Sequence, residues 1–168
     1  SYRVLIGHSA DSEANHIEIL HKLHAMEING LRAHVVLSYG AKPWDGDYKE
    51  LVKETGRGLF AESFIVIEEF MKIDEYRDFL ASMDLIILDH RYQQAMGNIV
   101  TALGLNVKIA LNPEANHFAY LKRLGFTVFN SKLLEESIQD NTLIENRSLA
   151  FETFSESKLL EGWNQLLA

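Results

Sequence analysis

Cysteine is absent from this chain of 168 residues. Disulfide bridges, Cys-ligated zinc sites and iron–sulfur clusters are therefore excluded. Proline occurs only twice and glycine ten times, which excludes collagen-like and low-complexity segments. No run approaches the roughly 18 consecutive apolar residues of a membrane-spanning helix, and the N-terminus carries no basic, apolar signal segment. The remaining composition, 47% hydrophobic and 24% charged, is that of a globular domain.

Basic residues are outnumbered, with 16 Lys and Arg against 24 Asp and Glu and a net charge of −8. Nucleic-acid binding depends on Lys and Arg contacts to phosphates, so we expect no nucleic-acid partner. A phosphate-bearing ligand is expected to be one small nucleotide, held by backbone N–H groups and a few bases. The chain enters a predicted strand directly after Ser1, which we interpret as a piece of a longer protein.

Short apolar runs alternate with segments of helical period along the whole chain. Six runs are predicted as strands, at residues 3–6, 33–39, 64–67, 85–88, 107–111 and 126–129. Helices are predicted at residues 15–28, 47–55, 74–83, 93–103 and 113–125, with two or three more in 132–168. The strands are continuously apolar, as in parallel sheets covered on both faces. The predicted fold is α/β, a Rossmann-like doubly wound parallel sheet of about six strands in a single domain.

Local signals predict where several helices begin and end. Asn15 and Glu18 have the spacing of a capping box at the start of the first helix. Gly56 is expected to end the second helix, and Pro113 to occupy the first position of the fifth. Trp163 is expected on a last helix that packs back onto the domain.

In doubly wound folds the ligand lies beyond the carboxyl ends of the strands. The turn after the first strand, Gly7 to Ser12, is made of small residues and precedes a helix N-terminus, which favours an anion. It matches neither the GxGxxG fingerprint nor the P-loop. A plain strand-to-helix turn is the alternative interpretation.

The stretch after the fourth strand, residues 89–98, is the most unusual in the chain. Arg91 supplies a cation, and Gln93 and Gln94 supply amides at the start of a helix, where backbone N–H groups are unpaired. Gly97 lies early in that helix at a cost of about 0.5–1 kcal/mol relative to alanine. The pattern suits a pyrophosphate and sugar hydroxyls. A solvated loop with a tolerated glycine is the alternative.

Glu68, Glu69 and Phe70 follow the third strand, where an aromatic ring beside carboxylates could stack a base and hold sugar hydroxyls. The alternative is a polar loop that tucks Phe70 into the core.

Seven histidines raise the question of a metal. His21 and His24 are three residues apart, with His16 upstream, but no HExxH motif and no third ligand complete a zinc site, so we predict no metal. His8 and His90 follow two strands and could serve as phosphate donors or as general acid or base. No nucleophile elbow occurs.

Three segments carry a family resemblance: residues 6–20, 70–80 and Arg91-Tyr-Gln-Gln-Ala-Met-Gly-Asn-Ile99. They resemble the C-terminal domain of the TDP-N-acetylfucosamine:lipid II N-acetylfucosaminyltransferases, which are 4-alpha-L-fucosyltransferases of enterobacterial common antigen synthesis. The last segment is similar to that family's Gln-Gln-x-x-Gly signature. Here Tyr92 directly precedes the Gln pair, where the family carries Arg, and Arg91 stands one residue earlier.

The resemblance implies one half of a GT-B glycosyltransferase. Residues 1–168 would be the C-terminal domain that binds the nucleotide-sugar donor, and the N-terminal acceptor domain would be absent. The whole enzyme would transfer N-acetylfucosamine (4-acetamido-4,6-dideoxygalactose) from dTDP to an undecaprenyl-diphosphate-linked disaccharide. It would need no cofactor or metal. It would be cytoplasmic and peripheral on the inner membrane.

The resemblance also implies roles for particular residues. The expected diphosphate ligands are Gly7, Ser9, Arg91, Gln93, Gln94 and Gly97. The expected sugar and nucleoside ligands are His8, Glu68, Glu69, Phe70, Asp89 and His90. The catalytic base is expected on the absent domain, so this chain alone should transfer nothing.

Three other functions compete with this one. The chain could be a non-catalytic nucleotide- or sugar-binding module, or part of a two-domain sugar-nucleotide epimerase. A phosphoacceptor receiver is disfavoured, because Gly-His-Ser-Ala stands where acids are needed after the first strand.

Overall fold

The computed structural model describes residues 1–92, 94–158 and 161. In chain order, its helices and strands are β1 (Tyr2–Ile6), α1 (His16–Ala25), β2 (Leu31–Val36), α2 (Tyr48–Phe60), β3 (Phe64–Ile67), α3 (Ile73–Ala81), β4 (Leu85–Leu88), α4 (Met96–Gly104), β5 (Lys108–Leu111), α5 (Asn116–Arg123), β6 (Phe129–Asn130), α6 (Leu134–Gln139) and α7 (Arg147–Phe154). In these described residues no helix is long and apolar enough to cross a membrane.

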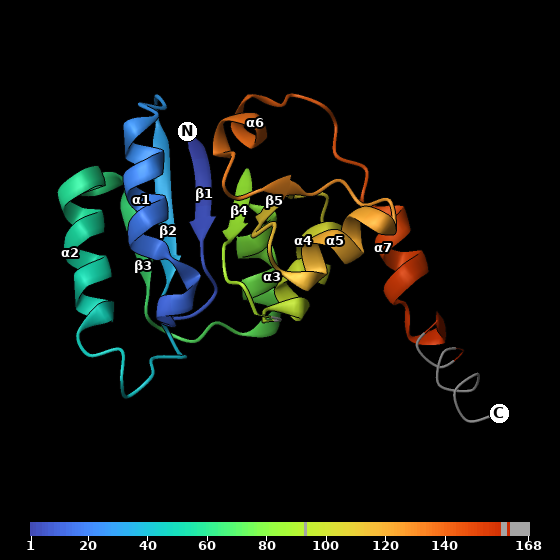
Figure 1. Cartoon of the computed structure of the whole chain (residues 1–168), viewed down its shortest axis with the longest axis horizontal. Coiled ribbons are helices and arrows are strands. Elements are labelled where there is room, and N and C mark those ends of the chain that lie inside the picture. Colours follow the sequence, from blue (N-terminus) through green and yellow to red (C-terminus); the bar gives the residue numbers. More distant parts are fainter. Residues whose placement is uncertain (93, 159–160, 162–168) are drawn as a thin grey trace.

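The six strands form one sheet in the order β3-β2-β1-β4-β5-β6, and every neighbouring pair is parallel. Helices α1 and α2 lie on one side of the strands, and α4, α5 and α7 lie on the other (Figure 1). The strand order reverses between β1 and β4, which is the topological switch point of a doubly wound sheet. The predicted Rossmann-like α/β fold is confirmed.

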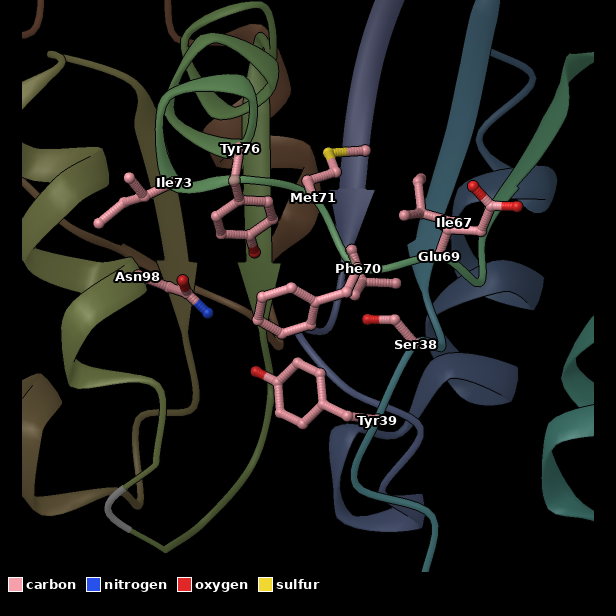
Figure 2. Close-up of a pocket in the computed structure, with 10 residues that line it drawn as sticks. Ser38, Tyr39, Ile67, Glu69, Phe70, Met71, Ile73, Tyr76 and Asn98 are labelled. Atoms are coloured by element: carbon pink, nitrogen blue, oxygen red, sulfur yellow. The ribbon is translucent and has the colours of Figure 1, made fainter.

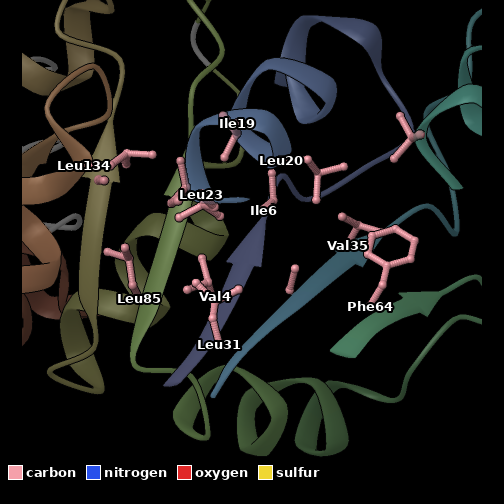
Figure 3. Packing of buried hydrophobic residues seen from close by; sticks show 14 of the residues in the cluster. Val4, Ile6, Ile19, Leu20, Leu23, Leu31, Val35, Phe64, Leu85 and Leu134 are labelled. Carbon is pink, nitrogen blue, oxygen red and sulfur yellow. The ribbon is translucent and has the colours of Figure 1, made fainter. Parts of the chain in front are cut away.

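Two hydrophobic clusters cover the two faces of the sheet. On one face, Ile19, Leu20 and Leu23 of α1 point down onto Val4 and Ile6 of β1 (Figure 3). On the other face, side chains of α3, α4, α5 and α7 cover the alternate strand residues. Because both faces are buried, the strands are mostly apolar rather than alternating, although Arg3, Arg32, His34 and Lys108 interrupt the pattern. Polar side chains gather at the carboxyl ends of the strands.

The capping box predicted at Asn15 does not form. Asn15 is the N-cap of α1, but its backbone is left-handed, with φ +54°, and its side chain makes no capping bond. It donates instead to Asp89 at the end of β4, with 2.9 Å between Asn15 Nδ2 and Asp89 Oδ2. Glu18 pairs with Lys22 at 2.6 Å rather than reaching back to the cap. A tertiary partner for Asn15 therefore replaces the local one.

Other predicted boundaries are wrong as well. Helix α2 continues through Gly56 to Phe60, because the glycine packs against Phe64 rather than ending the helix. Helix α5 begins at Asn116, so Pro113 lies in the preceding turn and not at the first helical position. Strand β6 is only Phe129–Asn130, three residues later than expected at its start. The helix expected around Trp163 lies outside the described residues.

Candidate functional site

The turns after β1 and β4 meet at the switch point, where α1 leaves toward one face of the sheet and α4 toward the other. Gly7, at the end of β1, donates its N–H to the carbonyl of Ile87 in β4 at 2.9 Å. Its φ of +68° and the His16 ring beside it leave no space for a side chain. The two predicted diphosphate segments are therefore brought together.

The turn after β2 packs tightly on the turn after β1. Ala10 donates its N–H to the carbonyl of Tyr39 at 2.6 Å. Gly40 has a φ of +84°, and a Cβ on it would lie 2.8 Å from Ser9 Cβ. Ser9 itself is 2% exposed. Its hydroxyl accepts from the N–H of Asp11 at 3.5 Å. The contact that we predicted between the Ser9 hydroxyl and a diphosphate stays a prediction.

Asp89 is a buried junction between elements. Its carboxylate accepts hydrogen bonds from Asn15 at 2.9 Å, from Lys132 at 2.7 Å and from the hydroxyl of Ser131. Its backbone carbonyl accepts from Asn112 at 2.8 Å. With 2% of the residue exposed, these partners occupy the carboxylate that we expected to bind sugar hydroxyls. The visible role of Asp89 is to tie α1, β4, β5 and β6 together, and sugar binding by this residue stays a prediction.

The turn between β4 and α4 presents the remaining predicted ligands. Arg91 is exposed and pairs with Glu114 at 2.9 Å. Gln94 accepts from the His90 ring through its carbonyl at 3.1 Å, and its amide lies 3.5 Å from Asp11 Oδ2. Helix α4 has no side-chain cap and no acidic residue in its first turn. Gly97 is exposed, and a Cβ there would meet nothing within 4 Å. Gln93 lies outside the described residues.

A pocket of about 460 Å³ opens beside this turn, at the ends of β2 and β3. The rings of Phe70, Tyr39 and Tyr76 face one another in it, and Asn98 reaches in from the first turn of α4 (Figure 2). Phe70 is 85% exposed, so the alternative that it enters the core is wrong. Burial raises the pKa of Tyr76 to about 12, and burial also raises the pKa of Tyr39. Both phenols are neutral at pH 7 and can donate hydrogen bonds.

The two glutamates after β3 point to different places. Glu69 lines the pocket with Phe70. Glu68 instead turns to α2, where its carboxylate lies 3.0 Å from Lys49 and 3.3 Å from Lys53. Hydrogen bonds from these two lysines lower the pKa of Glu68. The structure therefore does not bring Glu68 into the pocket that we predicted it to line.

His8 and His90 face each other at the switch point. Their ring centroids are 5.3 Å apart, with the rings edge to face, and the His8 ring also lies 6.2 Å from that of Tyr39. Burial lowers the pKa of both histidines, that of His8 to about 4. Both imidazoles are therefore neutral at pH 7.

Of the residues that line the pocket, the sequence interpretation assigned Glu69 and Phe70 to the site and missed the others, among them Ser38, Tyr39, Met71 and Tyr76. Ser38 and Tyr39 directly follow β2, so the strand-end rule used for the other turns would have found them. Tyr76 lies on α3 and packs partly against the core. Its second contact, with the pocket, depends on how α3 sits over the strand ends.

A metal site has no support among the described side chains, since no group of three or more His, Asp or Glu residues there could hold an ion. His21 and His24 are exposed on α1, whereas His16 is buried below them. The three histidines considered for zinc are therefore not brought together by the helix.

Comparison with known families gives a match over the whole chain. The model of the family described as 4-alpha-L-fucosyltransferase, glycosyl transferase group 56, matches residues 1–168. This chain belongs to that family. The resemblance that we drew from residues 6–20 and 91–99 is thereby confirmed.

Solved structures similar to this group 56 chain share its fold at low sequence identity. One is an alpha,alpha-trehalose-phosphate synthase (UDP-forming) from Burkholderia xenovorans in complex with glucose-6-phosphate. It has 9% identity and a TM-score of 0.71, with 99% of this chain and 42% of that one covered. Another is the C-terminal domain of LpcC, a glycosyl transferase group 1 family protein from Francisella tularensis. It has 14% identity and a TM-score of 0.64, with 96% and 85% covered.

The matched parts of these neighbours are domains of GT-B glycosyltransferases, so the group 56 chain has the fold of one GT-B half. A trehalose-6-phosphate synthase, OtsA, aligns over 99% of this chain but only 42% of its own length. The group 56 chain thus spans about two fifths of the synthases that it matches.

Proposed function

We propose that this chain is the donor-binding domain of its glycosyltransferase and that it takes a dTDP-sugar. The observation that carries the proposal is the aromatic pocket that ends at the first turn of α4. A nucleoside in the pocket would place its diphosphate at the turns after β1 and β4. This is the position expected for a ligand at the switch point of a doubly wound sheet.

The lining of the pocket suits a nucleobase. Phe70 and Tyr39 are 85% and 48% exposed, although large aromatic rings gain most when they are covered. A planar base between them would be stacked on a ring face and would remove apolar surface from water. Ser38 and the neutral phenols supply hydrogen bonds, and Glu69 and Asn98 can hold ribose hydroxyls.

The start of α4 suits a diphosphate. The N–H groups of its first turn have no side-chain cap, and the helix dipole favours negative charge there. Gly97 leaves open space on this turn. Among the described residues, Arg91 makes one ion pair, an exposed one with Glu114. Such pairs contribute about 0–1 kcal/mol, so Arg91 can turn to a bound phosphate at little cost.

The finer assignment rests on the family. We propose that the whole enzyme transfers N-acetylfucosamine from dTDP to an undecaprenyl-diphosphate-linked disaccharide at the cytoplasmic face of the inner membrane. The leaving dTDP would be stabilised by the α4 N–H groups and by Arg91, without a metal ion. The base that deprotonates the acceptor would come from outside this chain.

Calorimetric titration with dTDP, UDP and GDP tests the donor assignment. We expect micromolar to low-millimolar binding with a preference for dTDP, and weaker dTDP binding by Arg91→Ala. Phe70→Ala should weaken dTDP and thymidine alike, because its ring is placed on the base. Phe151→Ala is the matched control, since Phe151 is 67% exposed on α7, away from the pocket. An equal loss of dTDP affinity in the two Phe variants would contradict the assignment of the nucleoside to this pocket.

Two glycines of α4 test the diphosphate position. Gly97→Ala and Gly104→Ala both enter open space and should each stabilise the helix by about 0.5–1 kcal/mol. Only Gly97 lies in the first turn. We therefore expect Gly97→Ala to weaken dTDP binding and Gly104→Ala to leave it unchanged. Unchanged dTDP binding by both variants would place the diphosphate elsewhere.

A further inference from the structure

Three buried imidazoles form a row across the switch point. His8 follows β1, His90 follows β4, and His117 lies in the first turn of α5. The His90 ring centroid is 5.3 Å from that of His8 and 5.5 Å from that of His117. The three residues are 7%, 0% and 4% exposed. Polar rings so deep in a domain normally have hydrogen-bond partners.

Several nitrogens of this row have no hydrogen-bond partner among the described residues. His8 Nδ1 and His90 Nδ1 are buried and unpaired, as are both ring nitrogens of His117. His90 Nε2 lies 3.1 Å from the Gln94 carbonyl, which can only accept, so Nε2 carries the proton. His90 Nδ1 is therefore a bare acceptor in the ring next to His8. His8 and His90 directly follow β1 and β4, at the strand ends where a doubly wound sheet binds its ligand.

The groups around His8 leave it without a free counter-charge. The His8 ring makes edge contacts with Tyr39, which follows β2, and with His90, which follows β4. Asp11 of the β1–α1 turn acts on His8 electrostatically, and His8 in turn lowers the pKa of His16 in α1. The Asp11 carboxylate is already paired with Lys42 at 2.9 Å. Burial, and then His90, lower the pKa of His8 to about 4, and only Asp11 opposes them.

We propose that His8 takes up a proton from solvent when the donor diphosphate binds and then holds that diphosphate as an imidazolium. This inference rests on the donor site proposed above. A diphosphate at the switch point brings the negative charge that the free site lacks, which favours the charged form of the ring. As the bond between the sugar and the phosphate oxygen breaks, the leaving diphosphate gains charge, and its attraction to His8 strengthens.

Proton NMR of the histidine Cε1–H signals tests the inference on the intact chain. The probes are dTDP-glucose, whose diphosphate keeps both charges across the titration, and thymidine, which has none. We expect the titration midpoint of His8 to rise by at least one pH unit with dTDP-glucose and to stay in place with thymidine. His21, exposed on α1, is the internal reference and should not move.

The affinity for dTDP-glucose gives a second, independent measurement. If the pKa of His8 rises from about 4 to about 6, binding should be about fourfold tighter at pH 5.5 than at pH 8. His8→Gln should lose this dependence, and His21→Gln should keep it. Binding of dTDP-glucose with an unmoved His8 midpoint would overturn the inference while leaving the donor site intact. Binding of neither probe would overturn the donor site and this inference together.

Discussion

At the scale of single residues, Gly7 is held by two separate constraints. Its φ of +68° is unfavourable for any side chain, and a Cβ would lie 2.3 Å from His16 Nε2. Gly46 shares the first constraint alone, since it has a φ of +56° with nothing within 4 Å. We expect Gly46→Ala to cost about 1 kcal/mol. Gly7→Ala should cost about 3 kcal/mol, because strain and overlap add.

Urea unfolding of the two glycine variants measures this difference. Equal losses of unfolding free energy would mean that His16 moves aside without cost. The comparison also separates backbone strain from packing at the turn that carries the candidate site.

The buried histidines make stability depend on pH. Burial lowers the pKa of His16 to about 4, as it does for His8, whereas an unfolded histidine titrates near 6.5. The unfolded chain therefore binds protons first as the pH falls. The stabilisation is complete above about pH 6.5 and is lost progressively down to about pH 4. We expect a loss of about 1–2 kcal/mol per histidine between pH 7.5 and pH 5.

Unfolding in urea at pH 7.5 and pH 5 checks the sign and size of this effect. His16→Gln should flatten the pH dependence, and His21→Gln should not, because His21 is exposed. A wild-type chain that is as stable at pH 5 as at pH 7.5 would contradict the neutral, buried state of these rings.

At the scale of elements, α2 and β3 are joined through a glycine in the middle of a helix. A Cβ on Gly56 would lie 2.2 Å from the Phe64 ring. Gly58, two residues on, faces open space. Gly56→Ala should therefore destabilise the chain by about 1–3 kcal/mol through overpacking. Gly58→Ala should stabilise it by about 0.5–1 kcal/mol through helix propensity.

If Gly56 is needed for packing against Phe64, thermal unfolding should show a lower melting temperature for Gly56→Ala and a higher one for Gly58→Ala. A stabilising Gly56→Ala would show that Phe64 adopts another position. The same pair explains why Gly56 was misread as a helix end: a glycine that breaks a helix and a glycine that admits a neighbour are identical in sequence.

At the scale of the whole molecule, the prediction concerns what the chain can do alone. Since the acceptor base is expected outside residues 1–168, we expect this chain to bind dTDP but to transfer no sugar to a lipid-linked acceptor. A transfer assay with the chain alone and with the full-length protein checks this. Transfer by the chain alone would place acceptor site and base within it.

Sequence reasoning predicted most of the fold and part of the candidate site. Buried strands are apolar, so the six strands and their parallel arrangement could be predicted from runs such as Leu85–Leu88. The strand-end rule then located Phe70 and the turn from Asp89 to Gly97. It could not show that Glu68 pairs with lysines of α2 rather than lining the pocket.

The sequence by itself therefore determined the class of fold and the family, and it pointed to the edge of the sheet where we propose the site, because these depend on local patterns and on motif spacing. Only the tertiary structure decided the partners of individual polar side chains. The Asn15 side chain bonds Asp89 instead of capping its helix, and Tyr76 packs against the core and also lines the pocket beside Phe70. The physical reason is that hydrogen bonds and ring contacts across the sheet compete with local ones, and their outcome depends on distances that no spacing in the chain encodes.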